Sequence, residues 1–202
     1  MAPRLQIRRH PERALAVPED AQAILAQGIV AHVGFEQEGW PYVMPMTFLY
    51  REGSIFLHGA PGSRIIKTLG AGARCCITVT LLDGLIASKS AETHSVNYRS
   101  VVCFGRGRSV TDERTRVAVL EEMIGRYFPG RAAGADYAHI TRQELKATRL
   151  VEVPLEAISA KGRDGGPRGP FDADPDAPGS AGVFAPVIGG GPLDANDGPS
   201  LP

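Results

Sequence analysis

The stretch IVAHVGFEQEGWPYVMPMTFLYREGSIFLHG, residues 29–59, contains three apolar runs of strand length separated by two short polar turns. The runs cover 29–35, 40–50 and 54–59. Each turn ends on a glycine, a residue that tight hairpin turns favour, so the pattern predicts a meander of three antiparallel strands. Pro41 and Pro45 lack the N–H that a sheet ladder needs. The second strand is therefore expected at a sheet edge, or with its backbone facing something other than a neighbouring strand.

Outside this stretch the sequence predicts more strands than helices. Helices are expected at 18–28, 61–72 and 111–130, and a short one after the capping-box pattern at 141–144. Strands are expected as a pair around the Leu-Asp-Gly turn in 73–90, at 96–107 and at 148–160. Six or seven strands in hairpin order predict a mainly β fold, a small antiparallel barrel with a few helices, and argue against a doubly wound sheet.

The composition changes after residue 160. Ten of the 24 glycines and eight of the 16 prolines lie in the last 42 residues. We therefore expect one globular domain over 1–160, with a short helical lead-in at its N-terminus, and a Gly/Pro-rich tail over 161–202.

Overall charge and apolar runs exclude several classes of partner. Lys and Arg number 22, as do Asp and Glu, so no global field attracts nucleic acid or an anionic membrane. No run reaches the roughly 20 apolar residues of a membrane span, and the N-terminus lacks the apolar segment of a secretory signal. Cys75, Cys76 and Cys103 have no CxxC spacing and are expected as buried or half-buried free thiols in a reducing cytoplasm. The five histidines lack metal-ligand spacing, so no metal site is expected.

The segment HGAPGSRIIK, residues 58–67, has the composition of an anion site. It joins a strand end to a helix start, and the first N–H groups of a helix favour negative charge. Arg64 adds a planar fork that suits a phosphate, and Ser63 adds a hydroxyl donor. The alternative is an ordinary strand-to-helix turn with a capping serine and a solvated arginine.

Two other segments place polar groups where a ligand could use them. In YVMPMTF, residues 42–48, the prolines leave backbone groups that a flat heterocycle could satisfy, although they could also simply block edge-to-edge aggregation. In HSVNYRSVVCFGRGR, residues 94–108, a polar half precedes an apolar core strand. That polar half is either one wall of a site or a strand end emerging into solvent.

Taken in order, these segments resemble the flavin-binding split-barrel proteins of the pyridoxamine 5′-phosphate oxidase-like superfamily, and within it the nitroimidazole-resistance (Nim-type) branch. The resemblance rests on residues 32–48, 54–64, 76–110 and, more weakly, 158–167. It implies a split β-barrel and a homodimer with an FMN at each subunit interface.

The resemblance also implies roles for particular residues. It places His58, Gly59, Ala60, Ser63 and Arg64, helped by Lys67, on the FMN phosphate. It places Val43, Met44, Pro45, Met46 and Thr47 along the isoalloxazine ring, and brings Asn97, Arg99 and Ser100 to the flavin, often from the partner subunit. Two features depart from the family: Ile65 stands where many relatives have a basic residue, and the end GPSLP lacks the basic motif of true pyridoxamine phosphate oxidases.

The function expected from this resemblance is an FMN-dependent oxidoreductase that acts on a small molecule by hydride or electron transfer through flavin N5. His94 is the candidate proton donor, with an ordinary loop histidine as the alternative. Two other functions stay open: a flavin- or haem-binding protein for storage or sensing without turnover, and a reductase that uses the deazaflavin F420.

Overall fold

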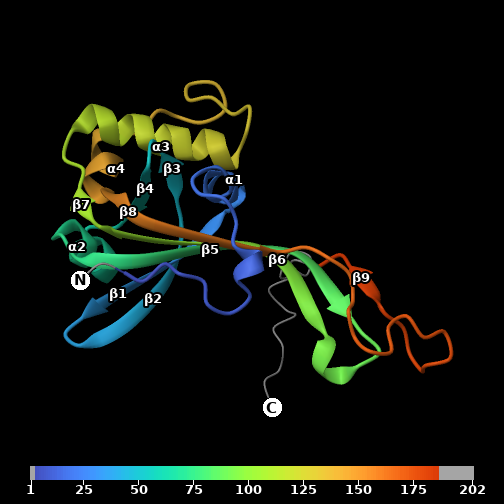
Figure 1. Ribbon diagram of the computed structural model, residues 1–202. Helices are drawn as coiled ribbons and strands as arrows, with labels where there is room; N and C mark the ends of the chain where they lie inside the picture. Colours follow the sequence, from blue (N-terminus) through green and yellow to red (C-terminus); the bar gives the residue numbers. More distant parts are fainter. Residues whose placement is uncertain (1–2, 187–202) are drawn as a thin grey trace, which may run out of the picture. The chain divides into compact units, whose positions relative to one another are not determined.

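A computed structural model describes residues 3–186 of the chain (Figure 1). Its described part is mainly β, as predicted, with four α-helices and nine strands. The helices are α1 (Glu19–Gln27), α2 (Arg64–Gly70), α3 (Glu113–Tyr127) and α4 (Arg142–Ala147). The strands are β1 (Val30–Gln37), β2 (Trp40–Thr47), β3 (Leu49–Arg51), β4 (Ser54–Gly59), β5 (Arg74–Ala87), β6 (Ser95–Arg106), β7 (Arg108–Ser109), β8 (Arg149–Arg163) and β9 (Gly182–Phe184). Within residues 3–186, no helix is both long and apolar enough to cross a membrane.

The chain divides into two compact units. Unit 1 combines residues up to 81 with residues 99–162, and unit 2 combines 82–98 with the residues from 163 onward. Strands β5 and β6 contribute residues to both units, and the last residue of β8, Arg163, belongs to unit 2. The predicted division into a domain over 1–160 and a tail over 161–202 remains a prediction, and residues 187–202 of that tail lie outside the described residues.

The order of the strands forces the sheet to curl. The described strands pair in the order β2-β1-β5-β6-β8-β4-β3, with β7 beside β8 and β9 beside β5. β2 ends at Thr47 and β3 begins at Leu49, so a single residue, Phe48, joins the two ends of this order. A sheet whose first and last strands are one residue apart has to bring its edges together, which produces a barrel that is split between β2 and β3.

Both hairpin turns of the opening stretch are confirmed, but the meander is wrong. β2 pairs with β1, and β3 pairs with β4, all antiparallel. The predicted second strand over 40–50 is broken at Phe48, so the two hairpins lie at opposite ends of the strand order. The physical reason is that the side chain of Phe48 is fully buried while its backbone N–H and C=O bond to side chains of α3. The predicted edge position of the proline-containing strand is confirmed.

The Leu-Asp-Gly turn predicted within 73–90 is also wrong, because β5 is one continuous strand. The two confirmed hairpins have glycines with left-handed backbone, Gly39 at φ +80° and Gly53 at φ +79°, whereas Gly84 has no positive φ. Gly84 serves a close approach instead: a Cβ there would lie 3.0 Å from Cγ1 of Val183 in β9. The sequence pattern Asp-Gly thus marks a crowded strand position of unit 2.

The main core fills the inside of unit 1. Inward side chains of the barrel strands pack with α1 and α2, and the largest fully buried members are Ile24, Leu25, Val33, Phe48, Ile55, Leu57, Ile65, Leu69, Ile77, Val79 and Val101. A second cluster packs α3 on β3, β4 and β8 through Leu49, Phe56, Val119, Met123 and Leu150. Cys75 and Cys103 are buried and Cys76 is half-buried, all as free thiols, which confirms the predicted burial and free state of the three cysteines. Burial raises the pKa of Cys75 and of Cys103 to about 12.

The end of α3 holds the break at Phe48. The guanidinium of Arg126 donates to the carbonyls of Phe48, Leu25 (2.8 Å) and Gly28, and its central carbon lies 4.6 Å from the centre of the Phe48 ring. The Tyr127 hydroxyl accepts the Phe48 N–H at 2.8 Å and donates toward the Phe48 carbonyl at 2.6 Å. These two side chains satisfy backbone groups that would otherwise be left unpaired where β2 and β3 separate.

We therefore expect Arg126→Ala to lower the free energy of unfolding by about 2–4 kcal/mol, the scale of losing several hydrogen bonds to a charged group. The measurement is urea unfolding followed by circular dichroism. Arg131→Ala is the matched control, because Arg131 is exposed and donates to the Asp136 carbonyl at 2.7 Å; its cost should stay below about 1 kcal/mol. Equal effects of the two substitutions would contradict the role of Arg126.

Candidate functional site

The loop between β4 and α2 is built as an exposed turn with unused donors. β4 ends at Gly59, and the Ser63 N–H donates to the Ala60 carbonyl at 2.9 Å to close the turn. Ser63 stands at the N-cap of α2, but its hydroxyl makes no capping hydrogen bond. The capping role that served as the alternative interpretation is therefore not used here, and the hydroxyl remains available to a ligand.

Arg64 connects this loop to β2. Its guanidinium carbon lies 4.3 Å from the centre of the Tyr42 ring, and Tyr42 in turn stacks on Phe35 with ring centres 5.6 Å apart. A cation over an aromatic face is attracted to it while its N–H edge stays free to bind an anion. Two of the three segments singled out in the sequence, 58–67 and 42–48, are thus brought together by one contact.

His58 has a buried ring nitrogen without a partner. Its Nδ1 atom is buried and makes no hydrogen bond within the described structure. Burial also lowers the pKa of His58, which favours the neutral imidazole. A neutral ring with its proton on Nε2 leaves only an acceptor unpaired at Nδ1 and presents an N–H at the half-exposed side of the ring. His58 therefore fits a site that offers a hydrogen-bond acceptor, such as a phosphate oxygen.

The glycines and the two residues after Arg64 complete the picture of the loop. Gly59 is closely packed, because a Cβ there would meet Cγ1 of Ile66 at 3.0 Å. Gly62 faces open space, with no atom within 4 Å of such a Cβ. Ile65 is only 2% exposed and belongs to the core, so it cannot face an anion, whereas Lys67 is exposed on the same helix.

The segment Val43–Thr47 forms the exposed face and free edge of β2. In the register with β1, Val43 lies opposite Gly34, Pro45 opposite His32 and Thr47 opposite Val30. Val43 is 65% exposed and Met44 is 41% exposed, while Met46 packs against the core. Because β2 pairs with β1 alone among the described strands, one side of its backbone is open along an apolar surface.

The third segment is divided between the two units, and its polar side chains have partners inside the chain. In unit 1, Arg99 donates to Oε1 of Gln27 at 3.2 Å and the Ser100 hydroxyl donates to the Lys161 carbonyl at 3.2 Å. In unit 2, Asn97 is buried, donates to the Gly165 carbonyl at 3.0 Å and accepts from Arg163 at 3.3 Å. The bond of Arg99 ties β6 to the end of α1, and the bonds of Asn97 and Ser100 tie it to the end of β8 and the residues after it, a role that sequence reasoning missed.

His94 is exposed in unit 2, at the end of a 3₁₀ turn over Ala91–Thr93. Its Nδ1 lies 3.2 Å from the Ser90 carbonyl and 3.2 Å from the Ala91 carbonyl. Carbonyl oxygens only accept, so Nδ1 carries the proton and Nε2 of the neutral ring carries a lone pair. In this form Nε2 can accept a proton or bind a metal ion, and it can donate a proton only after the ring has been protonated.

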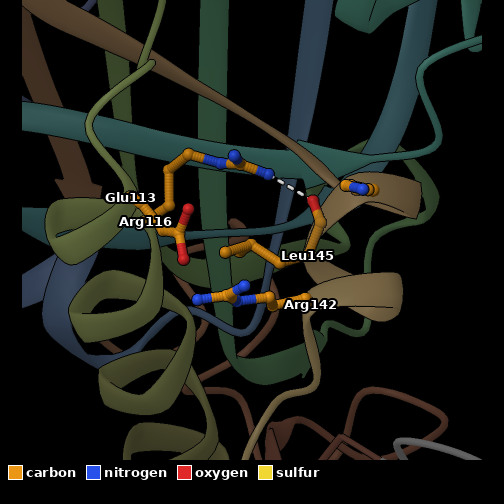
Figure 2. Close-up of a pocket in the computed structure, with 5 residues that line it drawn as sticks. Glu113, Arg116, Arg142 and Leu145 are labelled. Atoms are coloured by element: carbon orange, nitrogen blue, oxygen red, sulfur yellow. Dashed lines mark hydrogen bonds between the residues drawn. The ribbon is translucent and has the colours of Figure 1, made fainter.

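A separate pocket lies between α3 and α4 in unit 1 (Figure 2). It has a volume of about 230 Å³ and is lined by Glu113, Arg116, Arg142, Leu145 and Lys146. Arg116 has a structural role, because it donates to the carbonyls of Leu145 and Thr148 where α4 ends. None of the residues predicted from the sequence lines this pocket.

Comparison with known proteins adds independent findings. A family model described as pyridoxamine 5′-phosphate oxidase matches residues 18–162. The flavocytochrome Anf3 from Azotobacter vinelandii is similar at 29% identity and a TM-score of 0.79, over 100% of this chain and 93% of that one. The FAD and heme binding protein from Mycobacterium smegmatis is similar at 31% identity and a TM-score of 0.78, over 94% of each chain.

A candidate 5-nitroimidazole antibiotic resistance protein from Bacteroides thetaiotaomicron shares the fold at 23% identity and a TM-score of 0.61, over 74% of this chain and 86% of that one. No curated protein matches the sequence.

The buried Nδ1 of His58 leads to a prediction about pH. Because burial lowers the pKa of His58 below its ordinary value of 6.5, the unfolded chain binds a proton at this residue more readily than the folded chain. The stabilising contribution of the neutral ring is therefore complete above about pH 6.5 and decreases as the pH falls toward the folded-state pKa. We therefore expect the free energy of unfolding to fall less between pH 7.5 and pH 5.5 in His58→Gln than in the parent protein.

The measurement is urea unfolding at both pH values for the two proteins, with His32→Gln as the control because His32 is exposed. A pH dependence that is unchanged in His58→Gln would contradict the prediction.

Proposed function

The chain belongs to the pyridoxamine 5′-phosphate oxidase family, and from this premise we propose that it is a flavin-dependent oxidoreductase that acts on a small molecule. The observation that carries the proposal is the position of Arg64, whose guanidinium is held over Tyr42 between the loop 58–67 and β2. The loop 58–67 suits the phosphate of a flavin nucleotide, and β2 suits the isoalloxazine ring of the same nucleotide.

The phosphate would be held by groups that the structure leaves available. Arg64 offers its fork, Ser63 a hydroxyl without a capping bond, and His58 an Nε2–H. Many relatives have a basic residue at the position of Ile65. In this chain Lys67, in the second turn of α2, would supply that positive charge instead. Gly59 and Ala60 keep the backbone before the helix uncovered, and the open space at Gly62 leaves room for a ligand.

The flavin ring would lie along the free edge of β2, from Val43 through Met44, Pro45 and Met46 to Thr47. When bound, a flavin supplies hydride or electron transfer through its N5 atom. The chain supplies position, apolar contacts that exclude water, and the backbone groups next to the prolines. Since Asn97, Arg99 and Ser100 already bond within the chain, we propose that they position β6 beside the site.

We also propose that the protein works as a homodimer in the cytoplasm. Along the β1–β2 hairpin, Trp40 is 71% exposed next to the turn, Val43 and Met44 are exposed further along β2, and Ile29 and Val30 are exposed at the opposite end of the hairpin. An apolar surface of this kind is characteristic of an interface. A second copy would cover it and enclose the flavin, and the three free thiols fit a reducing compartment.

A flavocytochrome is the second candidate function. It is supported by the extent of the similarity, because the match to the flavocytochrome Anf3 spans 100% of this chain and the match to the FAD and heme binding protein spans 94%. These relatives also make FAD an alternative to FMN. Neither alternative changes the proposed role of the 58–67 loop, since both flavin nucleotides carry a phosphate at the same position of the ribityl chain.

The first experiment identifies the chromophore. We expect the purified protein to be coloured, and mass spectrometry of the extracted chromophore to return FMN or FAD; recovery of F420 would overturn the assignment. Steady oxidation of a reduced nicotinamide with an acceptor such as a nitroimidazole supports an enzyme. Bound flavin without turnover across a panel of acceptors supports a binding or sensing protein instead.

The second experiment tests the phosphate loop. Arg64→Ala should weaken flavin binding by about 1.5–3 kcal/mol, the scale of a hydrogen bond to a charged group, which is roughly a 10- to 150-fold rise in Kd. Arg106→Ala is the matched control, because Arg106 is exposed and donates to the Gly72 carbonyl just beyond the other end of α2. Fluorescence titration of the stripped protein measures both. An unchanged Kd in Arg64→Ala would contradict the loop assignment.

A further inference from the structure

The pocket between α3 and α4 is surrounded by charged side chains that have no partner inside the protein (Figure 2). Its volume of about 230 Å³ is far above the space that a single water needs and below the roughly 300–1,000 Å³ of pockets for drug-sized ligands. The side chains of Glu113, Arg142 and Lys146 are exposed there, and within residues 3–186 they make neither a hydrogen bond nor an ion pair. The pocket therefore has the size and the free charges to bind a small charged molecule.

Arg116 lines the pocket with a guanidinium that is already held in place. Its Nη2 donates to the carbonyl of Leu145 and, at 2.7 Å, to the carbonyl of Thr148. These two bonds fix the half-buried guanidinium, while its Nε–H and Nη1–H groups have no partner among the described residues. A cation that is fixed, partly desolvated and still has free donors binds an anion with little further loss of side-chain freedom.

Two neighbouring carboxylates cap the helices and form no ion pair with these cations. Asp112 caps α3, where its carboxylate accepts an N–H at 2.8 Å and a hydroxyl at 2.7 Å from the first turn of the helix. The carboxylate of Glu144 accepts the N–H of Thr141 at 2.8 Å and its hydroxyl at 2.7 Å, in the capping box of α4. Arg142 and Lys146 are four residues apart on α4, a spacing at which like charges destabilise a helix. An anion bound in the pocket would offset this repulsion.

The positions of the charges around the pocket indicate the shape of the ligand. Figure 2 shows the guanidinium groups of Arg116 and Arg142 on opposite sides of the Leu145 side chain, with the Glu113 carboxylate between them. Leu145 is only 4% exposed and contributes the apolar part of the lining. This arrangement suits a molecule with an anionic group at each end, a short apolar chain between them, and a positively charged group for the Glu113 carboxylate.

We propose that this pocket binds an acidic amino acid, that is, a small dicarboxylate with one amino group, such as glutamate. Its two carboxylates meet Arg116 at one end and Arg142 at the other, Lys146 adds a third positive charge, and its ammonium group meets Glu113. The three positive charges and one negative charge of the lining are then matched by two negative charges and one positive charge of the ligand. A dicarboxylate without an amino group is repelled by Glu113, so this carboxylate provides the specificity. The inference is independent of the proposed flavin function, because none of the five lining residues belongs to the proposed flavin site.

Arg114 provides a matched control in the same part of the chain. It is exposed on α3 and carries the same charge as Arg142, but it does not line the pocket. Replacing either arginine with alanine changes the net charge of the protein by the same amount. A general attraction of anions to this surface would therefore weaken equally in both variants, whereas the proposal expects weaker binding in Arg142→Ala alone.

The experiment is isothermal titration calorimetry of the purified full chain with L-glutamate, glutarate and glutamine at constant ionic strength. In the parent protein we expect saturable binding of glutamate, and a Kd at least about fivefold higher for glutarate, which lacks the amino group, and for glutamine, which lacks the second carboxylate. Arg142→Ala should raise the glutamate Kd at least about tenfold, the scale of losing a hydrogen bond to a charged group, and Arg114→Ala should change it less than about twofold. In Glu113→Gln the negative charge is gone, so glutarate should bind at least as tightly as glutamate.

Circular dichroism confirms that each variant is folded, and the visible spectrum reports the flavin content separately. The absence of saturable glutamate binding in the parent protein would overturn the proposal. Equal losses in Arg114→Ala and Arg142→Ala would contradict the location of the site, and a Glu113→Gln variant that still prefers glutamate would contradict the role of that carboxylate. Displacement of glutamate by an equal concentration of inorganic phosphate would indicate a general anion site and overturn the assignment of an acidic amino acid.

Discussion

The break of the chain at Phe48 is the constraint on which the rest of the barrel depends. At this residue the chain leaves one end of the strand order and begins the other, so its N–H and C=O cannot both be paired by strands. Arg126 and Tyr127 take over these groups from the end of α3, and Arg126 also holds carbonyls at the end of α1. A charged donor suits this position because one guanidinium can serve several carbonyls that point at the same place.

The same constraint determines where a ligand can bind. β2 reaches Phe48 with one side paired to β1 and the other side open, and its prolines keep that side from pairing with another strand. The open edge is useful to a ligand only if its position is fixed. The hairpin to β1 and the side chains of α3 fix the strand at its two ends, while the contact between Arg64 and Tyr42 links it to the 58–67 loop.

Local features of this fold could be predicted from the sequence, and long-range ones could not. The turns at 38–39 and 52–53 were predictable because each contains a glycine, the residue that most readily adopts the left-handed backbone found there. The break at Phe48 was not, because the run 40–50 is continuously apolar and the residues that bond Phe48 lie 78 and 79 positions away. The Asp-Gly pair at 83–84 led to the wrong prediction of a turn. Its glycine is instead explained by the close approach of Val183, which leaves little room for a Cβ.

The same distinction holds for the candidate site, where residue types were predictable and protonation was not. Two histidines were singled out from the sequence, and their surroundings place the proton of the neutral ring on different nitrogens. The unpaired, buried Nδ1 of His58 favours a proton on Nε2, which makes the accessible nitrogen a donor. The carbonyls around Nδ1 of His94 place its proton there, which makes the accessible nitrogen an acceptor. A donor suits an anionic phosphate and a lone pair suits a metal ion, so the hydrogen bonds behind each ring decide which chemistry its exposed nitrogen can serve.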